Sequence, residues 1–356
     1  METKIMKNRS ITIVTARALS IGMLMANSNN LVAMDPQDRR HGEKIIEAAA
    51  RGDIDAVRAE LKRGVSVDAP CLRLSRKGFC NGATALCYAA GGNHEEIAHL
   101  LLSKRADPNG RHTDIFTPLH HAAGAGHPTM VKRLLEAGAN PNRDHHQYGT
   151  PLHIAASAEV VEALLTAKGI HLESENHAHA TPLHETLAGR NWERAKRGTT
   201  HDWTQPAERR RMADMPRAIQ LLIKAGANPD KRDGNHGMTA LHMAVLKVGS
   251  PAGNMNRTDR ISAIRALVTA GADPEACGGW HHGEKGPYDN PRFFEQWYKN
   301  PPPTRHECHT PLYLAAASYG DRGIFFHTKG STHAVRILLE LGAQMAPEKK
   351  HGFCRR

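Results

Sequence analysis

Four histidines of this chain recur in almost the same surroundings. His120, His153, His184 and His242 each follow a Thr-Pro-Leu or Thr-Ala-Leu triplet. An imidazole titrates near neutral pH and serves as a general base or a metal ligand, so each is a candidate for such chemistry. The sequence, however, contains no phosphate-binding Gly-Lys-Ser loop, no Gly-x-Ser-x-Gly elbow and no His-Glu-x-x-His helix. It therefore predicts a protein that is not an enzyme and needs no cofactor.

A second set of candidate ligands flanks the segment 277–309. Cysteines and histidines stand near both of its ends: Cys277, His281, His282, His306, Cys308 and His309. If the ends meet, four of these side chains could hold zinc, or Cys277 and Cys308 could form a disulfide in an exported protein. The spacing matches no regular zinc module. The sequence leaves zinc, a disulfide and free thiols open, and it predicts no metal site.

The residues around the recurrent histidines form a repeat. TALCYAA begins at Thr84, TPLHHAA at Thr117, TPLHIAA at Thr150, TPLHETL at Thr181, TALHMAV at Thr239 and TPLYLAA at Thr310. The first three intervals are 33, 33 and 31 residues. A period near 33 residues predicts a stack of small helical units rather than one globular core.

Within one unit the residue types predict two short helices and a hairpin. Thr117 can cap a helix with its hydroxyl, and Pro118 suits the first helical position, which needs no backbone donor. The stretch MVKRLLEAG places Val131, Leu134 and Leu135 at helical spacing, and its glycine can end that helix in a left-handed conformation. One unit cannot bury its own apolar face, so the units must stack.

These motifs resemble the ankyrin repeat family. The resemblance rests on TPLHHAA and TPLHIAA and on the helix ends LLEAGANPN, LLIKAGANPD, LVTAGADPE and LLELGA. It implies an all-α solenoid of about seven helix–turn–helix–hairpin repeats over residues 42–346, in which the recurrent histidine makes a structural hydrogen bond. Two departures stand out. The fourth repeat lacks the Gly-His turn between its helices, and Ile115 and Tyr148 replace a hairpin glycine.

The resemblance also implies a non-enzymatic scaffold that binds a protein partner on its concave face. The hairpin tips of that face contain the predicted contact residues Arg111, His112, Asp114, Arg143, His145, His146, His177, His179, Lys231, Arg232 and His236. The formal charge of +11 favours an acidic partner. Trp280 and Trp297, in the aromatic-rich segment 277–309, are further candidate anchors, although these rings could instead cover the flank of the array. A monomer without a membrane span is predicted.

Insertions are predicted to interrupt the array near residues 71–82, 190–215, 248–259, 277–309 and 318–332. The segment 190–215 is rich in arginine and contains Trp203. Basic side chains interleaved with aromatic rings can bind a phosphate backbone, so binding of a nucleic acid or another polyanion is the alternative function. Acidic residues dilute the charge of the segment, which favours a solvated excursion over such a site.

The two ends of the chain lie outside the predicted array. Residues 1–35 contain basic residues followed by the apolar run ALSIGMLMA, which has the form of a secretory signal, although Arg17 shortens the apolar stretch. They are predicted to be either a signal peptide or an N-terminal extension, and export and a cytoplasmic location both stay open. Residues 347–356 form a basic C-terminal tail.

Overall fold

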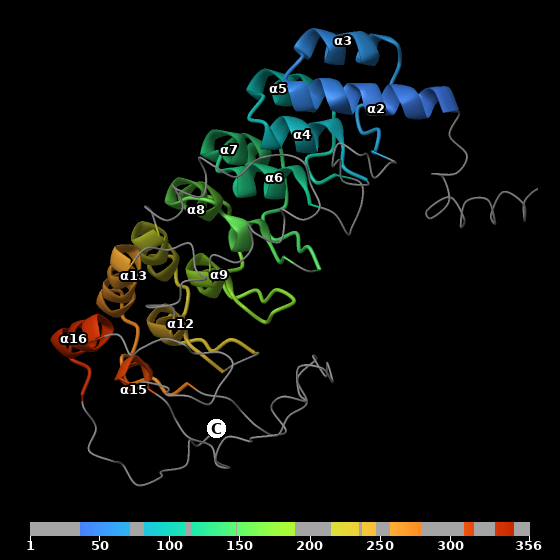
Figure 1. Cartoon of the computed structure of the whole chain (residues 1–356). Helices are drawn as coiled ribbons and strands as arrows, with labels where there is room; N and C mark the ends of the chain where they lie inside the picture. The colour runs from blue at the N-terminus through green and yellow to red at the C-terminus, as the bar shows by residue number, and fades with distance from the viewer. Residues whose placement is uncertain are drawn as a thin grey trace, which may run out of the picture.

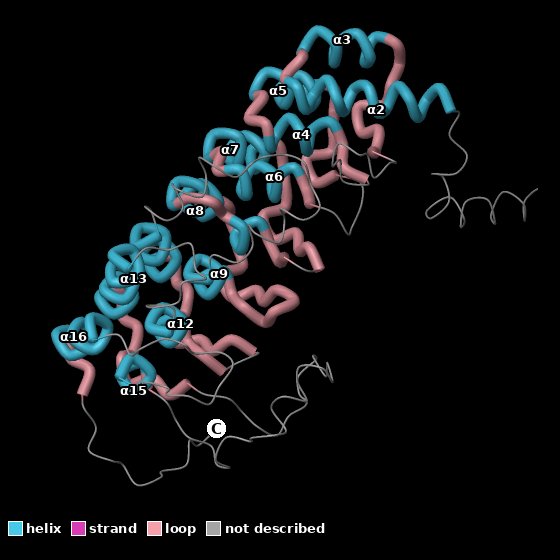
Figure 2. Tube along the Cα trace, in the orientation of Figure 1, coloured by secondary structure: helices cyan, strands magenta, loops and turns pink. Residues whose placement is uncertain are grey.

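The structure, a computed structural model, describes residues 36–71, 82–110, 116–146, 148–188, 215–234, 237–246, 257–278, 310–316 and 332–344. The described residues form helices that lie in two adjacent rows along an elongated array (Figure 1). The longer loops project from one side of this array (Figure 2). The predicted all-α architecture of paired helices is confirmed.

One row contains the first helix of each pair. Its members are α2 (Pro36–Arg51), α4 (Ala85–Gly91), α6 (Pro118–Ala125), the 3-10 helix η1 (Pro151–Ile154), α9 (Pro182–Ala188), α12 (Ala240–Leu246) and α15 (Pro311–Ala316). Each contacts the next along the chain. The second row contains α3 (Ile54–Lys62), α5 (Glu95–Ser103), α7 (Pro128–Glu136), α8 (Ala158–Leu165), a helix over residues 215–224, α13 (Arg257–Thr269) and α16 (Thr332–Glu340).

The ends of the helices follow the predicted local chemistry. The Thr117 hydroxyl accepts a hydrogen bond from the His120 backbone N–H at 3.3 Å, and Pro118 opens α6. The following helix, α7, ends just before Gly138, whose φ of +89° is left-handed. Glycine adopts that conformation without steric strain, so it stops the helix as predicted.

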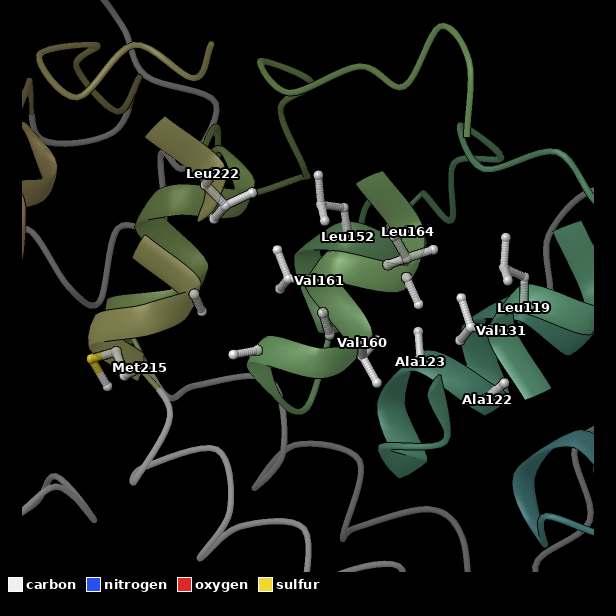
Figure 3. Close-up of a cluster of buried hydrophobic side chains, with 14 of the residues drawn as sticks. Leu119, Ala122, Ala123, Val131, Leu152, Val160, Val161, Leu164, Met215 and Leu222 are labelled. Atoms are coloured by element: carbon white, nitrogen blue, oxygen red, sulfur yellow. The ribbon is translucent and has the colours of Figure 1, made fainter. Parts of the chain in front are cut away.

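The core lies between the two rows and between successive units. Leu119 and Ala122 of α6, Val131 of α7, and Val160 and Leu164 of α8 are all fully buried. Figure 3 shows these side chains gathered along the inner faces of their helices. Alanine at the contact lets neighbouring helices approach closely, so a stack of short helices buries a continuous core with few aromatic rings.

Side chains at the hairpin bases tie each unit to the next. In six places among the described residues, a side-chain oxygen accepts the backbone N–H of the following unit at 2.7–3.0 Å. The pairs are Asp68–Asp107, Asn109–Asn140, Asn142–His171, Glu173–Asn228, Asp230–Asp273 and Glu275–Gln344. The last pair is 69 residues apart in sequence, so the register of the described units is kept across the insertions.

The short fourth unit is built differently, as its sequence predicts. Its first helix is reduced to η1, a single 3-10 turn. In two earlier units a histidine before the second helix, His94 or His127, hydrogen-bonds a carbonyl of the preceding first helix. The fourth unit has no such histidine, and the Ala156 backbone N–H donates to the Ala123 carbonyl at 3.0 Å instead. A direct backbone contact thus replaces the missing turn.

Most of the predicted insertions, with residues 1–35 and 347–356, lie outside the described residues. Where their edges are described, the helices extend further than predicted. α2 starts at Pro36, six residues before the predicted start of the array at residue 42, and Met215, the last residue of the predicted insertion 190–215, is a core residue with 3% exposure. In the described part of the chain, the helices are too short or too polar to cross a bilayer.

Candidate functional site

The recurrent histidines connect neighbouring units. His120 Nδ1 lies 2.8 Å from the Thr117 hydroxyl and accepts the Thr117 backbone N–H, while Nε2 lies 3.1 Å from the Gly149 carbonyl of the next unit. Because Nδ1 accepts a backbone N–H, it carries no proton, and Nε2–H donates to the carbonyl. His153 and His184 repeat the arrangement, reaching the carbonyls of Ala180 and Met238.

Burial keeps these imidazoles neutral. It lowers the pKa of His120 to about 3, and it also lowers the pKa values of His153 and His184. Both ring nitrogens of each are engaged in hydrogen bonds that hold the stack together. The structural role implied by the sequence resemblance is therefore confirmed for these three histidines.

The second unit makes the same connection with a thiol. Cys87 stands at the position of the recurrent histidine, with its Sγ 3.6 Å from the Thr84 hydroxyl and 3.7 Å from the Phe116 carbonyl of the next unit. The side chain is fully buried. The Cys87 thiol, a small and weak donor, therefore takes the place of the imidazole at this site. Unlike an imidazole, a thiol does not gain positive charge in mild acid.

The predicted contact residues of the hairpin tips lie in different environments. His146, His177 and Arg232 are exposed, and Arg143 is partly buried. His179 and Lys231 are also partly buried. Both contact the Glu175 carboxylate, at 3.4 and 3.0 Å respectively. The remaining predicted residues lie outside the described part of the chain: Arg111, His112, Asp114, His236, Trp280 and Trp297.

Glu175 pairs with some of the basic side chains on the hairpins and not with others. Partial burial raises its pKa, but hydrogen bonds and attraction from Lys231 and His179 outweigh that effect and hold the pKa below its usual value. Lys231 is therefore already neutralised within the chain. Arg143 and Arg232, in contrast, form no ion pair with any described carboxylate. Among the described hairpin residues that were predicted to contact a partner, these two arginines carry positive charge without such a pair.

For His145 the expected solvent-exposed tip position is wrong. Its side chain is only 7% exposed. The ring stacks on Phe116 with centroids 4.5 Å apart and planes 14° from parallel, and it also lies 4.7 Å from the His146 ring. The hairpin folds back because the His145 N–H donates to the Gly149 carbonyl, which turns the ring inward against the preceding unit.

His145 belongs to a group of rings that sequence reasoning missed. This ring cluster consists of Tyr88, Phe116, His121, His145, His146 and Tyr148, with neighbouring centroids 4.5–6.0 Å apart. It runs from α4 across α6 to the following hairpin. His146 is exposed, and Phe116, His121 and Tyr148 are half-buried. The unusual Tyr148 was a visible signal, but one of its ring partners, Phe116, comes from the preceding hairpin.

The cysteine and histidine group around segment 277–309 is described only at one residue. Cys277 is disulfide-bonded, so its sulfur is not a thiolate ligand for zinc. His281, His282, His306, Cys308 and His309 lie outside the described residues.

The comparisons with known proteins agree with this architecture. The family described as ankyrin repeats in three copies matches residues 45–145 and, in an overlapping alignment, residues 111–176. No match was found among curated proteins. The matched region contains the helices α3 to α8, the connection made by His120 to Gly149, and the whole ring cluster. Residues 45–176 of this chain are ankyrin repeats.

Proposed function

We propose that the face made by the hairpins and first helices binds an acidic protein partner, with the ring cluster as its apolar anchor. Ankyrin repeats are generally protein–protein interaction modules and typically non-catalytic. The family does not specify which partner this chain binds. Our proposal of an acidic partner rests on the partly exposed rings and on Arg143 and Arg232, which form no ion pair with a described carboxylate.

The observation that carries the proposal is the partial exposure of the ring cluster. Phe116, His121 and Tyr148 are half-buried and His146 is exposed, so each ring is held by its neighbours while part of it faces outward. Rings that are already fixed lose little conformational entropy when a partner binds. Aromatic residues of this kind dominate the energy of protein interfaces.

The charge of the same face supports an acidic partner. Arg143 lies two residues before the His145 ring, and Arg232 lies on a later hairpin. Neither is neutralised by a described carboxylate, whereas Lys231 is paired with Glu175. Complementary charge mainly accelerates association and selects the partner, so binding of an acidic protein should weaken as salt rises.

The same proposal extends the array beyond residue 176. We propose that about seven units of this type continue to residue 346 and that the chain acts as a monomer. The hydrogen bonds of Asp230 and Glu275 to the following units support this extension, because they repeat those of Asn109 and Asn142.

The experiment is affinity capture with the full chain, followed by titration of each captured protein. A variant carrying Arg111→Glu, Arg143→Glu and Arg232→Glu should weaken binding of an acidic partner about tenfold or more, with an unchanged circular dichroism spectrum. Tyr148→Ala with His146→Ala tests the anchor separately. Arg194→Glu with Arg210→Glu tests the rival polyanion site in segment 190–215. Loss of nucleic-acid binding in that variant, without loss of any protein partner in the others, would refute the proposal.

A further inference from the structure

Arg260 is a buried cation in the first turn of α13. Its side chain is 2% exposed, and its Nη1 atom is buried without a hydrogen-bond partner among the described residues. Burial lowers the pKa of Arg260 to about 10, so the guanidinium still carries its charge at neutral pH. Burying a charge without a counter-charge is strongly unfavourable. The position therefore needs an explanation beyond packing.

Earlier units place a histidine at this position. Arg260 precedes Leu267 by seven residues, as His94 precedes Leu101 and His127 precedes Leu134. His127 and His94 hydrogen-bond a backbone carbonyl of the preceding first helix through Nε2, at 3.0 and 3.4 Å. One carbonyl satisfies one imidazole nitrogen. A guanidinium has five donors and a full positive charge, so a carbonyl of that kind would not balance it.

Two exposed arginines of the same row of helices have counter-charges. Arg265, also on α13, contacts the Glu340 carboxylate at 2.9 Å, and Arg217 contacts Glu159 and Glu162 at 3.2 and 2.7 Å. These side chains are about half exposed and could be solvated by water instead. Arg260 is buried, so water cannot solvate its charge, and no described carboxylate serves as its partner.

The N-terminal end of the helix on which Arg260 lies has a positive potential of its own. α13 is 13 residues long and begins at Arg257, so Arg260 is in its first turn. Helical side chains in general lean toward the helix N-terminus, where the first backbone N–H groups have no acceptor within the helix. Those N–H groups and the helix dipole favour an anion there.

We infer that Arg260 and the first turn of α13 bind an oxyanion, a phosphate or a carboxylate group. The guanidinium supplies a two-pronged donor that fits either oxyanion, and the helix N-terminus supplies further donors. Such a ligand would provide the counter-charge that the described residues lack. This site is separate from the ring cluster, which lies on earlier units.

The test is isothermal titration of the full chain with inorganic phosphate and, separately, with acetate, each against sodium chloride at equal ionic strength. We expect saturable binding of at least one of the two anions, with an apparent Kd about tenfold or more weaker in Arg260→Gln. Preference for phosphate would identify a phosphate group as the ligand, and preference for acetate a carboxylate.

Arg265→Gln is the matched control, because it removes the same charge from an exposed position on the same helix, and it should leave anion binding unchanged. If Arg260→Gln does not fold, Arg260→Lys replaces it: lysine keeps the charge without the fork and should also bind the anion more weakly. The inference is overturned if neither anion binds saturably to the wild type, or if binding is the same in the Arg260 variant that folds.

Discussion

Two groups of histidines in this chain show how position within a repeat decides what an imidazole does. His120, His153 and His184 are buried at the start of the first helices, where each hydrogen-bonds both its own threonine and the next unit. His146 and His177 lie exposed on the hairpins. The first group holds the stack together and stays neutral, while the second lies on the surface that is proposed to meet a partner.

The comparison also shows that a hairpin position alone does not place a side chain in water. His145 and His146 are adjacent in sequence, yet the first is buried against Phe116 and the second is exposed. One imidazole therefore contributes to packing between units and its neighbour contributes to the surface.

The largest expected effect is loss of stability in mild acid. The pKa values of the buried histidines are lowered by folding, so the unfolded chain binds more protons below about pH 6.5. The stabilisation from these neutral rings is complete above that pH and falls as pH decreases. For His120, whose pKa in the folded chain is about 3, the loss between pH 7.5 and 5.5 is about 1.4 kcal/mol, and His153 and His184 each add a loss of up to that size. Urea unfolding followed by circular dichroism at pH 7.5 and 5.5 measures this loss.

A variant tests whether the buried histidines cause that acid sensitivity. His120→Gln should reduce the loss between pH 7.5 and 5.5 by about 1.4 kcal/mol. Equal pH dependence in the wild type and this variant would mean that His120 is not one of the titrating groups.

A smaller effect is expected from removing one buried imidazole at neutral pH. His153→Ala leaves the Thr150 N–H and the carbonyls of Ser174 and Ala180 without their ring partner. Because these buried groups are left unsatisfied, we expect the free energy of unfolding to fall by about 3 kcal/mol. The exposed counterpart His177→Ala should change the free energy of unfolding by less than about 0.5 kcal/mol. A similar cost for both would contradict the contrast between the two groups.

The smallest effect separates the two adjacent histidines. His145→Ala removes a stacked ring from Phe116 and should cost about 1 kcal/mol, which is above the near-zero change expected of a solvated tip. His146→Ala is the control, with an expected change of less than about 0.5 kcal/mol. Urea unfolding at neutral pH measures both, and a larger loss for His146→Ala would reverse the assignment.

The sequence alone determined the features that depend on neighbours along the chain. Thr117 caps, Pro118 opens a helix and Gly138 ends one because each acts on backbone groups within a few residues of itself. The 33-residue period and the apolar spacing then required stacking, and the resemblance supplied the role of His120. The missing turn of the fourth unit was also visible, because its consequence is local.

Only the tertiary structure decided which side chains meet across units. Phe116 and His145 are 29 residues apart, and they stack because the hairpin at Gly149 folds back onto the preceding unit. Glu175 and Lys231 are 56 residues apart and pair only because the units between them stack in register. Likewise, an arginine such as Arg260 is normally expected to be exposed to solvent, yet in the fold it is buried. Contact across units depends on register, which the pattern within one unit does not specify.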